Sequence, residues 1–263
     1  MSSLITAGVD IGSSTSKAVI LDDRQILSYS IISTSFESET SARKAVDQAL
    51  SKVGQISQED IRWIIATGYG RVIVTFANET VTELSCHARG ANWLFPSVRT
   101  VLDMGGQDCK AIKCDDRGNL LNFVMNDKCA AGTGRFLEVM ARVTELYLED
   151  IGEFSLQADE VIKISSTCAV FGKSEVASLL RQGKKKTDIL AGLHTAISNR
   201  VYTLLRRVGI TPDFAITGGI AKNIGVVRRL EERSGLKVLL PDEPQIVGAL
   251  GAALFAQDKL SNQ

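Results

Sequence analysis

The stretch Asp10–Arg24 reads DIGSSTSKAVILDDR, and 93 positions later the chain reads DMGGQDCKAIKCDDR over Asp103–Arg117. The two stretches align without a gap, and seven of the fifteen positions are identical. Each copy follows a short apolar segment, and an aspartate ends that segment before a Gly-rich or Ser/Thr-rich turn. The pattern predicts the same strand–turn–strand unit twice, with returning strands over 17–21 and 110–114.

The two predicted turns have the composition of a phosphate-binding site. Exposed backbone N–H groups and hydroxyls can surround phosphate oxygens, and a carboxylate at a strand end can hold hydrated Mg²⁺. The carboxylates are those of Asp10 and Asp103. The turn residues are Gly12, Ser13, Ser14 and Thr15 in the first copy and Gly105 and Gly106 in the second. The alternative interpretation is an old duplication that serves folding alone.

A third element has related features near the C-terminus. The apolar run 214–217 predicts a strand, Gly218-Gly219 follows it, and a helix is expected to open over 220–223. Paired glycines allow a flat ring to approach the backbone closely. The small residues over 247–254 predict a helix that packs tightly.

The order Asp-x-Gly-Ser, Asp-x-Gly-Gly-Gln and Thr-Gly-Gly before a helix resembles the ATPase superfamily of actin, hexokinase and acetate kinase. The resemblance implies an α/β fold of two ribonuclease-H-like (actin-like ATPase) domains with a nucleotide cleft between them. We expect an N-terminal lobe over 1–97, joined by the C-terminal helix at about 245–263, and a C-terminal lobe over 98–244. It also implies that Gly218, Gly219 and Lys222 line the adenosine side of bound ATP or ADP.

Two of the five cysteines stand in similar contexts. Cys129 and Cys168 each precede a predicted helix, and the partial positive charge at a helix N-terminus stabilises the thiolate, which is the ligand form. Cys109 and Cys114 are five apart on one predicted strand and point to opposite faces, and Cys86 has no partner nearby. Two ligands per chain favour a metal cluster completed by a second subunit, whereas buried small hydrophobic thiols are the alternative.

Over 8–255 the chain resembles the ATP-dependent activators of 2-hydroxyacyl-CoA dehydratases, which belong with the ATPase subunits of benzoyl-CoA reductase. The resemblance implies a homodimer with one [4Fe–4S] cluster ligated by Cys129 and Cys168 of each subunit. It implies an electron donor, ferredoxin or flavodoxin, and an iron–sulfur dehydratase or reductase as the partner. The motifs that carry it are Ala66–Arg71, Glu83–Ala88, Asp103–Asp108, Asn126–Phe136 and Ser165–Cys168.

Further roles follow from motif position. Gln107 is expected to orient the attacking water, and Lys17 and Lys110 either neutralise phosphate charge or are solvated hairpin lysines. Gly132, Thr133 and Gly134 either couple the cluster helix to the nucleotide or form a plain loop. One departure is Lys173, where the family usually has Glu, and we expect a lysine there to raise the cluster potential.

Composition narrows the remaining classes. Thirty basic and thirty acidic residues balance, so neither nucleic acid nor a membrane is an expected partner. No apolar stretch reaches the ~20 residues of a membrane span, no signal segment precedes the first strand, and a cytoplasmic location is expected. The alternatives to a redox activator are a small-metabolite kinase of the same fold and a non-redox actin-like nucleotide-binding module.

Overall fold

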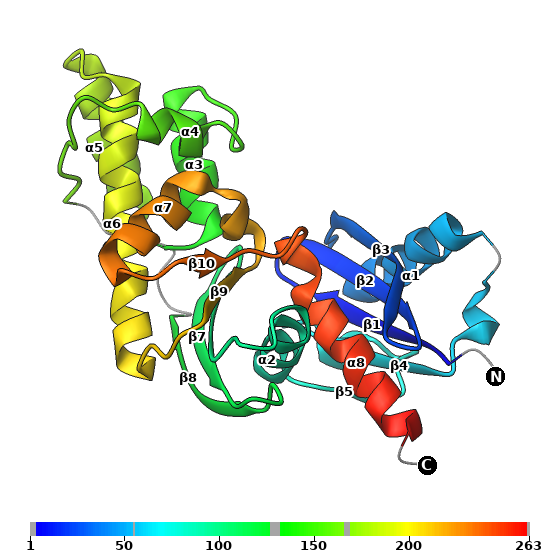
Figure 1. The fold of residues 1–263 in the computed structure, drawn as a ribbon. Helices are drawn as coiled ribbons and strands as arrows, with labels where there is room; N and C mark the ends of the chain where they lie inside the picture. The colour runs from blue at the N-terminus through cyan, green and yellow to red at the C-terminus, as the bar shows by residue number, and fades with distance from the viewer. Residues whose placement is uncertain (1–3, 55, 127–131, 166–168, 262–263) are drawn as a thin grey trace. The chain divides into compact units, whose positions relative to one another are not determined.

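The computed structural model describes residues 4–54, 56–126, 132–165 and 169–261 (Figure 1). The chain forms two compact units. The first comprises Met1–Val101, Cys114–Leu121 and Pro241–Gln263, and the second comprises Leu102–Lys113 and Asn122–Leu240. Among the described helices, none is both long and apolar enough to cross a membrane.

The first sheet has the strand order β3-β2-β1-β4-β5. The strands β1 and β2 are antiparallel and pair Asp10 with Lys17, whereas β4 runs parallel to β1. The strands are β1 (Ile5–Ile11), β2 (Thr15–Asp22), β3 (Gln25–Ser33), β4 (Trp63–Thr67) and β5 (Glu79–Thr80). The helices of this unit are α1 (Ser38–Val53), α2 (Glu83–Leu94) and α8 (Val247–Ser261).

The side chains of β2 point alternately to the two faces of this sheet, and their contacts show which helix covers each face. Ala18 and Ile20 share a buried cluster with the Ala-rich stripe of α1. Val19 and Leu21 share a different cluster with Ala249 and Leu250 of α8. Because successive side chains of a strand point to opposite faces, α1 covers one face and α8 the other. The C-terminal helix therefore belongs to the core of the N-terminal unit.

The second sheet has the order β10-β9-β6-β7-β8. Read from the β8 edge, this is the order of the first sheet, with β6, β7, β8, β9 and β10 in the places of β1, β2, β3, β4 and β5. Its strands are β6 (Thr100–Met104), β7 (Cys109–Cys114), β8 (Leu120–Asn126), β9 (Phe214–Thr217) and β10 (Val238–Leu239). Its helices are α3 (Gly134–Thr144), α4 (Ile151–Leu156), α5 (Ala169–Arg181), α6 (Lys186–Val208) and α7 (Ile224–Ser234). The repeat predicted from one hairpin thus extends to a whole sheet.

Two local predictions differ from the structure. The helix expected to open at Ile220 is a short 3₁₀ turn, Gly219–Lys222, and α7 begins only at Ile224, where the side chain of Asn223 accepts a hydrogen bond from the Val226 N–H. Helical spacing in the sequence also groups Tyr147 with the buried face of α3. That helix ends at Glu145, whose left-handed φ of 54° breaks the pattern, and Tyr147 is exposed.

Candidate nucleotide site and cluster segments

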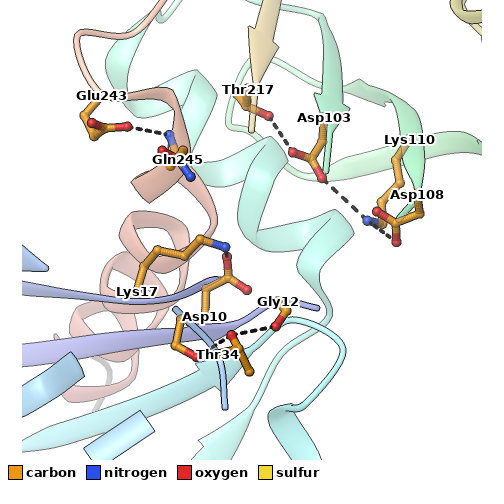
Figure 2. Close-up of polar contacts among 11 residues, drawn as sticks. Asp10, Gly12, Lys17, Thr34, Asp103, Asp108, Lys110, Thr217, Glu243 and Gln245 are labelled. Atoms are coloured by element: carbon orange, nitrogen blue, oxygen red, sulfur yellow. Dashed lines mark hydrogen bonds and ion pairs between the residues drawn. The ribbon is translucent and has the colours of Figure 1, made fainter. Parts of the chain in front are cut away.

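The first turn is closed by its own backbone and by a buried ion pair. The Gly12 N–H donates to the Thr15 carbonyl over 3.0 Å. Asp10 is 5% exposed, and Lys17 Nζ lies 3.0 Å from Asp10 Oδ2 (Figure 2). The antiparallel register places these two side chains opposite each other on neighbouring strands. Lys17 is therefore a buried partner of Asp10 and not a solvated hairpin lysine.

Polar groups around this turn are arranged to accept a ligand. The Thr34 hydroxyl donates to the Gly12 carbonyl over 2.9 Å (Figure 2). The Thr34 N–H donates to the Ser14 carbonyl over 3.0 Å. Within the described residues, the buried Ser14 Oγ has no hydrogen-bond partner. A buried hydroxyl of this kind costs free energy unless a ligand or water satisfies it. Phosphate oxygens would do so.

The Ala66–Arg71 motif packs against Asp10 and the end of β1. Gly68 has a φ of 84°, and a Cβ there would meet Asp10 Oδ1 and the Ile11 backbone. The Gly70 N–H donates to the Ile11 carbonyl over 3.0 Å. Arg71 holds the loop, because its Nη1 donates to the Gly68 carbonyl and to Glu83 Oε2. The motif thus fixes the strand end that carries Asp10.

From the sequence, His87 is expected to have only a structural role, and nothing in its motif indicates that it lies close to Asp10. A Cβ on Gly248 would lie 2.9 Å from His87 Nε2 and 3.3 Å from Asp10 Oδ2. The imidazole of α2 and the carboxylate of β1 therefore both approach the first turn of α8. Only a residue without a side chain fits between them. The small residues over 247–254 were the one sequence feature that indicated close packing here.

The second turn repeats the first in detail. The Gly105 N–H donates to the Asp108 carbonyl over 3.0 Å, the counterpart of the Gly12–Thr15 bond. Asp103 is 5% exposed, and its Oδ1 accepts a hydrogen bond from the Thr217 hydroxyl. Lys110 Nζ lies 2.8 Å from Asp108 Oδ2 and 3.5 Å from Asp103 Oδ2 (Figure 2). Lys110 is buried, so the solvated interpretation fails for it as well.

The predicted adenosine residues follow the strand beside Asp103. Gly218 has a φ of 81°, and a Cβ there would lie 2.7 Å from Asp103 Oδ1. Gly219 and Lys222 are exposed and belong to the short 3₁₀ turn. Gly68 and Gly218 thus occupy matching positions, each after a threonine that ends a strand parallel or adjacent to the aspartate strand. Gln107 is exposed at the tip of the second turn.

The second turn is bonded directly to helix α3. The Gly134 N–H donates to the Gly105 carbonyl, and the Arg135 N–H donates to the Gly106 carbonyl, both over 2.9 Å. Gly132 has a φ of 100°, and Thr133 is fully buried. The structure therefore brings Gly134 against the turn that contains Gly105 and Gly106, whereas a Cβ on Gly132 would face Val201 and Arg200 of α6.

The predicted cluster ligands, Cys129 and Cys168, lie outside the described residues. The other three cysteines are buried. Burial raises the pKa of the Cys86 thiol to about 12 and that of Cys114 to about 11, and it raises the pKa of Cys109 as well. Within the described residues, no three His, Cys, Asp or Glu side chains gather as a metal site. These thiols do not fit the role of thiolate ligands.

The helices that follow the two cysteines pack together. A Cβ on Gly172 of α5 would lie 3.1 Å from the Met140 side chain and 3.4 Å from the Phe136 ring, both on α3. From the sequence alone, Gly172 is expected to loosen the first turn of α5. The structure gives it a packing role, because it lets α3 approach α5 closely. Lys173, beside it, is exposed.

The donor set fits a magnesium nucleotide. Hard oxygen ligands from one or two carboxylates, with water completing the shell, are what Mg²⁺ prefers. Each turn offers one nearly buried aspartate beside a glycine-containing turn, and the first also offers the Ser14 hydroxyl. The second turn is bonded to the start of α3 through the Gly105 and Gly106 carbonyls.

Comparisons with known proteins agree with these features. Residues 7–256 match the model of the BadF/BadG/BcrA/BcrD ATPase family. The activator of lactoyl-CoA dehydratase from Anaerotignum propionicum is 45% identical over 97% of this chain and 98% of its own. A subunit of the benzoyl-CoA reductase from Thauera aromatica is 32% identical over 98% of this chain and 95% of its own.

Solved structures agree on the fold. The activator of 2-hydroxyisocaproyl-CoA dehydratase from Clostridium difficile, with bound ADPNP, superposes with a TM-score of 0.93 at 44% identity and covers 98% of this chain and 96% of its own. The ethanolamine utilization protein EutJ from Carboxydothermus hydrogenoformans shares the fold alone, with a TM-score of 0.62 at 16% identity over 95% of this chain and 90% of its own. The expected actin-like ATPase fold is confirmed. By sequence and by structure, this chain belongs to the BadF/BadG/BcrA/BcrD ATPase family.

Proposed function

We propose that this protein is an ATP-hydrolysing activator that delivers a low-potential electron to an iron–sulfur 2-hydroxyacyl-CoA dehydratase in the cytoplasm. The observation that carries the proposal is the full-length similarity to dehydratase activators, together with two intact aspartate–glycine turns. Identity to the dehydratase activators is well above identity to the subunit of benzoyl-CoA reductase, so a dehydratase is the favoured partner.

In this proposal each turn binds phosphate oxygens of ATP. The backbone N–H groups of Ser13 and Gly106 and the hydroxyls of Ser14 and Thr15 donate to them. Gly12 and Gly105, whose own N–H groups close the turns, contact the phosphates. Asp10 and Asp103 hold Mg²⁺ through water. The ion, when bound, withdraws charge from the transferring phosphoryl group. Exposed Gln107 orients the attacking water, buried Lys17 and Lys110 balance the charge, and Gly218, Gly219 and Lys222 line the adenosine side.

Cys129 and Cys168 are the proposed ligands of a [4Fe–4S] cluster, with two cysteines from each subunit of a homodimer. The cluster, when bound, supplies one-electron chemistry at low potential. The proposed donor of that electron is a reduced ferredoxin or flavodoxin. The burial of Cys86, Cys109 and Cys114 supports this ligand set, because it leaves the other two cysteines as the available thiolates.

The second turn offers a physical route from nucleotide to cluster helices. Gly105 and Gly106 accept hydrogen bonds from the first turn of α3, so a shift of their backbone on binding phosphate moves that turn. Helix α3 then bears on α5 at Gly172. Nucleotide state can bias the two helices only through contacts that differ between states, and these bonds are the contacts proposed to differ. Gly132, Thr133 and Gly134 are thus proposed as coupling residues.

The test is iron and subunit stoichiometry on protein purified without oxygen. We expect about four irons per dimer, lost in Cys129→Ala and in Cys168→Ala and retained in the matched control Cys114→Ala. The wild-type protein should also activate a 2-hydroxyacyl-CoA dehydratase only when ATP and a reductant are both present. Iron-free protein with intact ATP turnover would contradict the proposal. Phosphoryl transfer to a small metabolite would then support the kinase alternative. Nucleotide binding with neither dehydratase activation nor phosphoryl transfer would support a non-redox actin-like nucleotide-binding module.

A further inference from the structure

The two copies of the hairpin differ in charge. In the first turn, Asp10 faces Lys17, and the imidazole of His87 lies close by. In the second turn, Asp103 and Lys110 are joined by a further carboxylate, Asp108, which replaces Thr15 of the first copy. The first set sums to zero with a neutral histidine, and the second sums to one negative charge.

Asp108 also changes where the lysine lies. Lys17 Nζ is 3.0 Å from its strand-end aspartate, whereas Lys110 Nζ is 3.5 Å from Asp103 and 2.8 Å from Asp108. The short contact is to the residue that the first copy lacks. Lys110 is almost completely buried, so its ammonium must stay beside carboxylates. Of the two carboxylates that Lys110 is shown to contact among the described residues, Asp103 is the one left when Asp108 is removed.

We infer that Asp108 is a positioning residue that draws Lys110 away from Asp103, so that the second turn keeps the negative charge needed to hold the divalent cation of the nucleotide. This inference rests on the proposed function, since it concerns the cation that accompanies ATP. It assigns the two copies different tasks. The neutral first turn favours the phosphates, and the anionic second turn favours the metal.

The inference predicts opposite changes for two forms of the nucleotide. In Asp108→Asn, Lys110 neutralises Asp103, so the free Mg²⁺ needed for half-maximal tightening of ATP binding rises about tenfold. Binding of metal-free ATP stays equal or tightens, because one negative charge near the phosphates is gone. A variant that merely distorts the turn weakens both forms, so the two readouts separate positioning from structure.

The experiment measures the equilibrium dissociation constant of ATP at a series of free Mg²⁺ concentrations and in excess chelator. Asp108→Thr, which copies the first turn, should behave like Asp108→Asn. Asp108→Glu, which keeps the charge, should behave like wild type. The double variant Asp108→Asn with Lys110→Met should recover most of the Mg²⁺ dependence, because the ammonium of Lys110 then no longer approaches Asp103. Asp116→Asn removes an exposed carboxylate beyond the far end of β7 and serves as the matched control.

An unchanged Mg²⁺ requirement in Asp108→Asn, or a double variant no better than the single, would overturn the inference. So would equal weakening of ATP with and without metal. Those outcomes leave ATP binding by the wild-type protein intact. If the wild-type protein itself shows no Mg²⁺-dependent ATP binding, the proposed function fails first, so the two failures are distinguishable.

Discussion

The two turns share a backbone and differ in what holds it. In both, the glycine N–H bonds the carbonyl three residues on. The carbonyl of Gly12 then accepts from the Thr34 hydroxyl, which lies just beyond β3 of the same sheet. The carbonyl of Gly105 accepts from the Gly134 N–H at the start of helix α3. The first turn is therefore tied to its own sheet, and the second is tied to a helix.

That difference predicts which turn transmits a change of shape when a ligand binds. We expect the turn anchored by Thr34 to keep its shape when a ligand binds, because Thr34 directly follows β3 of the same sheet. A turn anchored by α3 passes any change of shape to the helix, and α3 packs against α5. Under the proposed function, we therefore expect one copy of the duplicated hairpin to act as a fixed phosphate site and the other to connect the nucleotide to the helices.

The strands that lead into the two turns differ as well. Gly8 of β1 corresponds to Val101 of β6. A Cβ on Gly8 would strike the Ala249 carbonyl and the Ala253 N–H of α8, so the helix backbone lies directly on the strand. Val101 is fully buried, and its position accommodates a branched side chain. The glycine is the condition for docking the C-terminal helix.

The largest predicted effect comes from giving β1 the residue of β6. Gly8→Val places three carbons where the α8 backbone now lies, and strand and helix cannot both stay in place. We expect the free energy of unfolding to fall by more than about 4 kcal/mol. Urea unfolding measures the loss. Gly183→Ala, with open space but a φ of 78°, is the control and should lose only about 1 kcal/mol from backbone strain. Equal stability of Gly8→Val and wild type would contradict this packing.

The second prediction concerns His194, the buried histidine of the second unit. Burial, reinforced by the nearby charge of Arg229, lowers its pKa from 6.5 to about 4, against hydrogen bonds with Leu190 and Asn223 that act the other way. The unfolded chain therefore takes up the proton first as the pH falls. Stability from the neutral ring is fully present above pH 6.5 and is lost as the pH falls towards about 4, by roughly 3 kcal/mol.

Unfolding free energies of wild type and His194→Gln, measured from pH 7.5 to 4, isolate this contribution. The variant should be less stable at neutral pH and should lose less stability on acidification. Parallel pH profiles of the two proteins would show that the imidazole is not the titrating group. The profile of His87→Gln provides the comparison with the first unit.

The third prediction compares glycines with similar backbone angles. A Cβ on Gly218 would lie 2.5 Å from the Met104 carbonyl and 2.7 Å from Asp103, at a φ of 81°. Gly235 has a φ of 70° and open space around it. Gly235→Ala should cost about 1 kcal/mol from backbone strain, whereas Gly218→Ala should cost about 2 kcal/mol more and weaken ATP binding. Equal losses in the two variants would mean that the strand end beside Asp103 yields freely.

Much of the fold was predictable, because its signals are local. The strands that contain Asp10, Asp103 and Thr217 could be predicted from short apolar runs and the glycines after them, although β1 and β6 each continue one residue past the aspartate. The lobe that the last helix joins was expected from the resemblance, but its close approach to Gly8 was not, since Gly8 and Ala249 are 241 residues apart in the sequence. Nothing in a periodic pattern indicates which strand a helix covers.

The candidate site divides in the same way. Asp10 and Lys17 were predictable as neighbours because the hairpin register fixes them. Thr34 and His87 reach the first turn from the end of β3 and from α2, and no motif spacing places them there. Asp108 was visible in the sequence within a motif, yet its role depends on two distances to Lys110 that only the structure gives.

The smallest predicted effect on stability is at the connection between the second turn and α3. A Cβ on Gly134 would lie 3.3 Å from Gly106 Cα and 3.4 Å from the Gly105 carbonyl, so the turn must move by a few tenths of an ångström. Alanine is also the better helix residue by up to about 1 kcal/mol. The two effects nearly cancel, and we expect Gly134→Ala to change the free energy of unfolding, measured in urea, by less than about 1 kcal/mol.

Measurements of ATP hydrolysis and dehydratase activation should distinguish the two turns better than the free energy of unfolding does. In Gly134→Ala, ATP-dependent activation of a dehydratase should fall much further than ATP hydrolysis, because the altered contact joins the turn to α3. The matched variant in the first turn is Thr34→Val, which removes the anchor of Gly12 and should reduce ATP binding and activation in equal proportion. If Gly134→Ala also lowers both in proportion, the second turn is an anchor like the first, and the coupling must run elsewhere.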